Sequence, residues 1–250
     1  MGFKMLHGLE IAVVAATAAG VALAAVPASA PCPQQAQRVP MPTGHDTAPL
    51  WVCMGQINVI SLADLPAPRR AEIAAEMSRN GPSPVSDRDG LWAEPLPPLV
   101  AEVGQGSPGR LAFTPLDLGG LVLADLQPLG AAQMADAHQG EAILSAVRYW
   151  RRTDGAALSL QENALTPNNA VVVVRELRNA SVAQRPAQLL VQCAPSGRVR
   201  SVVLWDSPRA SYTLTVDDDV DHPAQPRWNR DWLLGVAQRL AAREAPPGPD

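Results

Sequence analysis

The stretch that decides the fold is residues 186–216, which read PAQLLVQCAPSGRVRSVVLWDSPRASYTLTV. Three runs rich in β-forming residues occupy positions 188–193, 198–205 and 211–216, and two turn signals separate them. The first turn reads APSG, with proline and glycine at positions that suit a β-turn, and the second reads DSPR. The pattern predicts three antiparallel strands in a row.

The third run predicts a strand with one buried face. Ser211, Thr213 and Thr215 alternate with apolar neighbours, and successive side chains of a strand point to opposite faces of the sheet. The four valines at 171–174 are too apolar for a strand with one wet face. We therefore expect them near the centre of the same sheet, covered on both sides.

Two helices are predicted around this ladder. Residues 229–244 begin with Asn229, a residue type that caps helices, and carry an apolar stripe at helical spacing. Residues 67–79 follow a proline-rich entrance and form a shorter candidate. The expected fold class is α+β, a mostly antiparallel sheet with the C-terminal helix packed on one face and a short helix near residues 67–79.

The remaining elements of the predicted domain are less regular. Residues 50–62 and 118–126 are typical of strands. Residues 131–140 are predicted as a helix, and residues 147–161 as a hairpin around Asp154-Gly155, a favoured turn pair.

The first thirty residues match a secretory signal peptide. Lys4 gives a positive start, residues 11–26 form an apolar, alanine-rich run, and small residues precede a cleavage point after Ala30 or Ala28. An uncleaved membrane anchor is the alternative, although the run is short for a span. We expect export to the periplasm or the cell exterior, with no transmembrane span after cleavage.

Four segments follow from these boundaries. Residues 1–30 are expected to be the signal peptide and residues 31–49 an extended proline-rich leader. Residues 50–244 are expected to form a single α+β domain, and residues 245–250 a disordered tail.

Three cysteines remain after the predicted cleavage, Cys32, Cys53 and Cys193, so one disulfide is possible and one thiol is left over. A Cys53–Cys193 bridge would join two strand-like runs and close a long loop, and it is the favoured pairing. A Cys32–Cys53 bridge, which would fix the proline-rich leader, is the competing one.

Composition and motifs exclude several function classes. The formal net charge of −4 argues against a nucleic-acid-binding protein. Residues 104–109 match a glycine-rich dinucleotide motif, but the next residues favour a strand where the motif requires a helix. No nucleophile elbow is present. No cofactor is expected.

Arginines in the strand candidates form the main candidate binding site. Arg148, Trp150 and Arg152 would share one face of a strand, and neighbouring segments supply Arg175, Arg198 and Arg200. Such a face would suit an anionic glycan, a lipid head group or an acidic protein of the envelope. The alternative is a solvated face on which arginine stems cover apolar area.

A second candidate site is the acidic run that contains Asp217, Asp219 and Asp221. Alternate aspartates are Ca²⁺ ligands, but the positions that an EF-hand requires to be Gly and Glu are His222 and Trp228. Only an irregular metal site is compatible with the run.

Two functions are therefore kept open. The first is an exported, non-catalytic binding or envelope-associated protein that uses its sheet face. The second is a secreted hydrolase whose site is assembled from distant residues, with His138, Asp136 and a serine as candidates.

Overall fold

The computed structural model describes residues 14–15, 36–39, 50–86, 99, 113–134, 145–167 and 169–244. Within them the chain is mixed α and β, with one large sheet and two α-helices. Within the same residues, no helix is long and apolar enough to cross a lipid bilayer. Of the predicted signal peptide only Val14 and Ala15 are among the described residues. Most of the leader and the C-terminal tail lie outside them.

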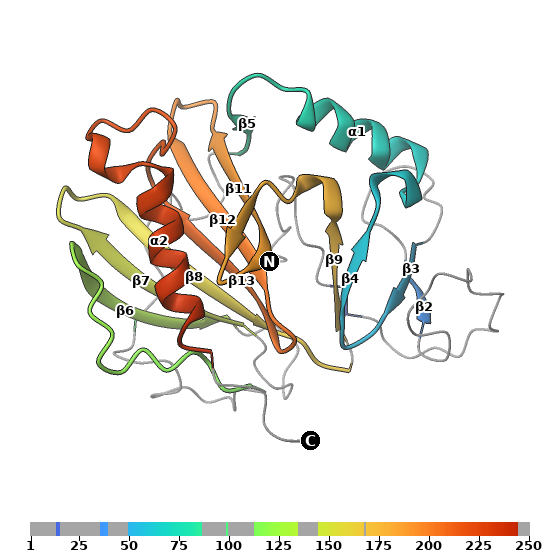
Figure 1. The fold of residues 1–250 in the computed structure, drawn as a ribbon, viewed down its shortest axis with the longest axis horizontal. Helices are drawn as coiled ribbons and strands as arrows, with labels where there is room; N and C mark the ends of the chain where they lie inside the picture. The colour runs from blue at the N-terminus through green and yellow to red at the C-terminus, as the bar shows by residue number, and fades with distance from the viewer. Residues whose placement is uncertain are drawn as a thin grey trace.

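The large sheet has the order β10-β11-β12-β13-β8-β7-β6, with the short β5 beside one end of β11 (Figure 1). Neighbours along this order are antiparallel, and β5 runs parallel to β11. The strands are β5 (Ser83–Pro84), β6 (Leu126–Met134), β7 (Ser145–Arg152), β8 (Ala157–Ala164), β10 (Ala180–Val182), β11 (Arg185–Cys193), β12 (Val199–Asp206) and β13 (Ala210–Val216).

The predicted three-stranded ladder is confirmed as β11, β12 and β13. The predicted hairpin around Asp154-Gly155 is also confirmed, since it joins β7 to β8. Gly155 has φ 99°, a conformation that glycine adopts without steric cost.

Two expectations for this sheet are wrong. Residues 131–134 belong to β6 and not to a helix, because Ala131 and Ala132 pair with Arg148 and Val147 of β7. Residues 118–125 form an irregular segment in place of the predicted strand. The rest of the predicted helix 131–140 lies outside the described residues.

The valine run forms β9 (Asn169–Val174), which is not part of the large sheet. It lies between β1 (Val14–Ala15) and β4 (Ile57–Ile60), antiparallel to the first and parallel to the second. A separate pair joins β2 (Ala36–Val39) to β3 (Leu50–Cys53). The prediction that the valines lie in the main sheet is therefore wrong, although most of them are buried.

The two α-helices are α1 (Ala67–Met77) and α2 (Arg230–Ala241). Asn229 caps α2, as its side chain accepts a hydrogen bond from the Trp232 backbone N–H. Short 3-10 turns lie at Leu62–Asp64 (η1), Arg175–Leu177 (η3) and Pro226–Trp228 (η4).

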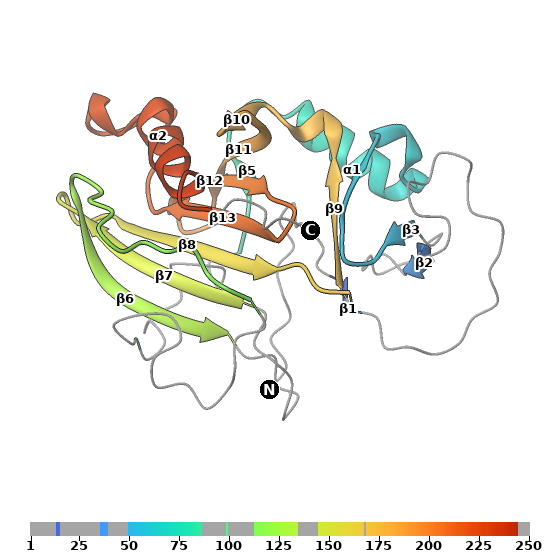
Figure 2. The same cartoon turned by 60° about the horizontal axis from the view of Figure 1, so that its bottom comes forward.

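The main core lies between α2 and the side of the large sheet that α2 faces (Figure 2). Leu233, Val236 and Leu240 of α2 are fully buried, and the same cluster includes inward residues of every long strand from β7 to β13 in the sheet. Trp205 and Tyr212 stack within it, with ring centroids 5.1 Å apart. Burial of this apolar area is the main force that holds the two layers together.

The outer edge of β11 is occupied at three places along its length. β10 pairs with its first residues and β5 with its last. Between them the side-chain amide of Asn179 bonds to the backbone N–H and C=O of Leu189, both at 2.8 Å. This amide stands where a neighbouring peptide group would stand in a longer strand.

Candidate binding surface

Arg148, Trp150 and Arg152 do share one face of β7, as their spacing predicts. That face is the one toward α2, because Trp150 and Arg148 lie opposite the core residues Leu158 and Leu160. Trp150 is 7% exposed and Arg152 is 3% exposed. The predicted binding face is therefore an interior face at these positions.

Arg152 is held by two carboxylates and two indole rings. Its guanidinium pairs with Asp154 and Asp218 and lies 4.5 Å from the ring centre of Trp228 and 5.2 Å from that of Trp232. The hydrogen bond that Arg152 donates lowers the pKa of Asp154, and burial opposes this shift without reversing it. The cluster fixes the loop after β13 to the β7–β8 hairpin, so it has a structural role.

Arg148 is also engaged inside the molecule. It pairs with Glu162, which is 1% exposed, and donates a 2.7 Å hydrogen bond to the backbone oxygen of Leu116. Burial raises the pKa of Glu162 although the charge of Arg148 and the Leu116 N–H oppose the shift.

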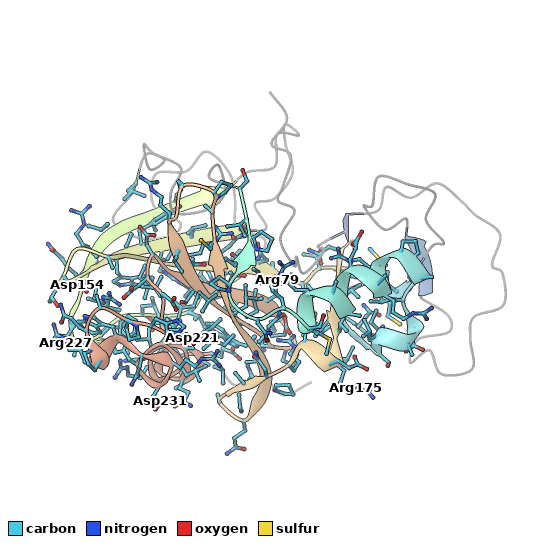
Figure 3. The ribbon with its side chains drawn as sticks, turned by 90° about the horizontal axis from the view of Figure 1, so that it is seen from above. Arg79, Asp154, Arg175, Asp221, Arg227 and Asp231 are labelled. Atoms are coloured by element: carbon cyan, nitrogen blue, oxygen red, sulfur yellow. The ribbon has the colours of Figure 1, made fainter. Side chains whose placement is uncertain are left out.

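The other three predicted arginines are not brought together. Arg175 lies in η3, far from Asp154 and Arg227 at the α2 end of the molecule (Figure 3). Arg198 is exposed in the turn before β12. Arg200 is 7% exposed on the sheet face away from α2 and donates to Gln192 at 2.6 Å. An arginine-lined binding face across these strands does not form.

The acidic run forms turns and ion pairs in place of a metal site. Asp221 makes a two-pronged pair with Arg230, which lowers the pKa of Asp221. Asp219 accepts backbone hydrogen bonds from Asp221 and His222. Over the described ranges, no group of three His, Cys, Asp or Glu side chains is placed to hold a metal ion, so Asp217, Asp219 and Asp221 do not form the expected site.

Cys193 is a free thiol, whereas Cys53 is not. The predicted Cys53–Cys193 bridge is therefore wrong. Cys193 lies on β11 and Cys53 at the end of β3, in different sheets. The competing Cys32–Cys53 bridge stays a prediction, since Cys32 lies outside the described residues.

The hydrolase candidates Asp136 and His138 also lie outside the described residues. His222 is 84% exposed, with its Nδ1 atom 3.3 Å from a carboxylate oxygen of Asp219. In the described part of the chain, no serine hydroxyl bonds to this imidazole, so no triad is formed around His222.

The sheet face away from α2 carries a group of side chains that we call the hydroxyl–amide face. It was not singled out as a site from the sequence. Its members come from three adjacent strands and all are uncharged. They are Ser145 of β7, Ser159, Gln161 and Asn163 of β8, and Ser211, Thr213 and Thr215 of β13.

The strand register places these residues in rows. Ser145, Asn163 and Ser211 lie side by side across the three strands. Gln161 and Thr213 form the next row. Adjacent rows are about 6.8 Å apart along a strand and adjacent strands about 4.8 Å apart, so polar groups are regularly spaced in two directions.

The accessible part of the face consists of Ser145, Gln161, Asn163 and Thr213, which are half-buried. The Gln161 amide donates to Ser145 Oγ at 3.3 Å and to Asn163 Oδ1 at 2.9 Å, which fixes its orientation. Neither the Thr213 hydroxyl nor the Asn163 Nδ2 group bonds to another described residue. The face therefore keeps both donors and acceptors for an outside partner.

Among the described residues, the charged side chains near the accessible group are few. Asp206 of β12 lies opposite Ser211 on this face, but its side chain is 8% exposed and pairs with Arg178. Tyr149 lies on the same face next to Ser159, and burial raises the pKa of its phenol, so it stays neutral. Arg151 is exposed on this face at the far end of β7. The alternation of Ser211, Thr213 and Thr215 was the sequence signal for this face, although it could not reveal which neighbours would join it.

Comparison with family models, with curated proteins and with solved structures gave no match for this chain.

Proposed function

We propose that this chain is an exported, non-catalytic binding protein whose hydroxyl–amide face takes an uncharged, hydroxyl-rich glycan. The observation that supports the proposal is the contiguous set of uncharged polar side chains across β7, β8 and β13, with Thr213 and Asn163 still able to bond outward.

The chemistry of the face suits a glycan. A sugar hydroxyl both donates and accepts, and amide and hydroxyl side chains do the same. The Gln161 amide is already oriented by Ser145 and Asn163, so it loses little conformational freedom when a ligand binds. Repeated donors and acceptors along two directions suit a ligand that repeats its own hydroxyl groups.

An anionic ligand is a poorer match for this face. On the opposite side of the sheet, Arg148 pairs with Glu162, and Arg152 pairs with Asp154 and Asp218. Arg200 lies at the edge of the face and is buried against Gln192. We therefore replace the anionic glycan or lipid expected from the arginines by a neutral glycan, and keep an envelope location as part of the proposal.

Export is proposed from the predicted signal peptide alone. The apolar run at 11–26 and the small residues before Ala30 are the grounds for it.

The test is retention of the purified chain on insoluble polysaccharides. Cellulose and chitin serve as neutral probes, and heparin-agarose as the anionic one. We expect binding to a neutral probe that persists in 0.5 M salt, about three times physiological strength, since uncharged contacts are little screened. The double variant Asn163→Ala with Thr213→Val should bind at least tenfold more weakly, about 1.4 kcal/mol.

Thr153→Val is the matched control, because Thr153 is exposed in the β7–β8 turn and not on the face. It should leave retention unchanged. The proposal fails if neither neutral probe retains the chain, if only heparin does, or if the double variant binds as well as the unmodified protein while both remain folded.

A further inference from the structure

Residues 113–125, which we call the strap, cross the same side of the sheet as α2 (Figures 1 and 2). The strap has no helix or strand of its own. Its Leu116 and Leu123 are 6% exposed and belong to the main core, and the partly buried Leu118 and Leu121 pack against that core. Val122, the residue before Leu123, is 82% exposed. The strap is thus held by four leucine side chains and by little backbone bonding to the sheet. Such a segment opens at lower free-energy cost than a strand.

One end of the strap is fixed by a buried ion pair. Glu162 accepts a 2.8 Å hydrogen bond from the Leu116 N–H, and Arg148 donates a 2.7 Å hydrogen bond to the Leu116 oxygen. Glu162 and Arg148 also pair with each other. Both backbone groups of Leu116 are thus bound by the two side chains of one ion pair.

The other end continues directly into the sheet. Asp125 has φ 67°, in the left-handed region, and its oxygen accepts a 3.0 Å hydrogen bond from the Thr153 N–H. The chain then enters β6 at Leu126. Between the two ends lies the turn Gly119-Gly120, where Gly120 has φ 68°. The Gly119 N–H donates to Asp117 at 2.8 Å and the Leu121 N–H to the Leu118 oxygen at 3.0 Å, so the middle of the strap is hydrogen-bonded within itself.

We propose that the strap opens from the sheet as one unit, with the Glu162–Arg148 pair as its latch and Asp125 as its hinge. Opening withdraws Leu116 and Leu123 from the core and uncovers apolar side chains beside α2. The newly exposed surface is apolar, is covered by the strap in the closed state, and lies on the side of the sheet opposite the hydroxyl–amide face. The proposal does not depend on glycan binding.

Native-state hydrogen exchange of the unmodified protein in increasing, non-denaturing urea tests the first part. We expect strap amides to exchange together, at least 100-fold faster than amides of β13, at a rate that urea hardly changes. Urea insensitivity is the signature of a small opening that exposes little surface. If strap amides exchange at the rate and with the urea dependence of β13, the strap does not open separately and the proposal is overturned.

Variants test the latch. Glu162→Gln removes the charge that holds Arg148, and we expect strap exchange to rise at least tenfold with β13 unchanged. Arg148→Lys keeps the positive charge but cannot bind Glu162 and the Leu116 oxygen together, so an increase of at least threefold is expected; it also decides the matter if Glu162→Gln does not fold. Equal increases in the strap and in β13, or none in either, would contradict a latch.

Asp206→Asn is the matched control. Asp206 is also a buried carboxylate paired with an arginine, Arg178, and burial likewise raises its pKa. It makes no bond to the strap, so strap exchange should stay within twofold of the unmodified protein. The fluorescence of an added naphthalene-sulfonate dye, which reports exposed apolar surface, should rise at least twofold for Glu162→Gln and not for Asp206→Asn.

Discussion

Replacing Arg152 by methionine removes the cation that pairs with both Asp154 and Asp218. The substitution keeps an unbranched side chain of similar reach between Trp228 and Trp232 but leaves Asp154 and Asp218 without their shared partner. Two carboxylates are then close to each other and to two indole rings with no positive charge between them. Both effects destabilise the folded state.

The magnitude follows from burial. Removing one partner of a fully buried ion pair costs about 3–5 kcal/mol. The Asp154 and Asp218 side chains keep 21% and 19% exposure, so solvent relieves part of the penalty and the lower end applies. Loss of the cation–π contacts adds about 0.5–2 kcal/mol, partly offset by the packing of methionine. We expect a net loss of about 3 kcal/mol in the free energy of unfolding.

Urea unfolding followed by tryptophan fluorescence measures this loss, and a thermal scan should show Tm lower by about 6–12 °C. Asp218→Asn in the Arg152→Met background removes one uncompensated carboxylate and should restore about 1 kcal/mol. Arg175→Met is the control, since Arg175 is exposed, and it should stay within about 0.5 kcal/mol of the unmodified protein. A loss below about 1 kcal/mol for Arg152→Met would refute the view that this cluster is structural.

Three further predictions concern the titration of two carboxylates and the state of the cysteines. The pKa of Glu162 is raised in the folded state, so the folded protein protonates Glu162 more readily than the unfolded chain does. The free energy of unfolding of the unmodified protein, measured relative to Glu162→Gln, should therefore rise as pH falls from 7 toward the ordinary pKa range of glutamate. The pKa of Asp154 is lowered, so the stability advantage of the unmodified protein over Asp154→Asn should instead disappear as pH falls below the ordinary aspartate range. Urea midpoints across about pH 2–7, a span that reaches below the usual carboxyl values, measure both trends, and the same trend in the two variants would contradict both predictions. In the oxidised protein, alkylation without reduction should modify Cys193 alone, and peptide mapping should recover Cys32 joined to Cys53; modification of all three cysteines would show that no disulfide forms.

The sequence predicts elements where local signals agree with the packing. Gly155 does make a hairpin turn, and Asn229 does cap α2. Ser211, Thr213 and Thr215 do alternate with core residues, but Ser211 and Thr215 are themselves buried, so the expected solvent-exposed face of β13 is limited to the half-buried Thr213. In each of these cases the decisive interactions lie within a few residues of the chain. Short-range chemistry is what pattern reading detects.

The failures have long-range causes. Ala131 and Ala132 favour a helix by intrinsic preference, but pairing with β7 places them in a strand whose register shifts between Pro128 and Gly130. The valines of β9 were read as a central strand of the main sheet because nothing local distinguishes one sheet from another. Alternation correctly put Arg148 and Arg152 on one face of β7, but it does not say which face a helix will cover. The hydroxyl–amide face needs the register of three strands, which no single segment contains.

The Asn179 amide beside Leu189 affects how this protein behaves when many copies are close together. An unfilled row of peptide groups on β11 would invite the same row of another molecule, the first step toward fibrils and swapped dimers. One carboxamide fills the gap between β10 and β5 at the cost of a single side chain. The sheet is therefore guarded against growth from this border without an extra strand, which matters for a protein proposed to work in a compartment where ATP-driven refolding is absent.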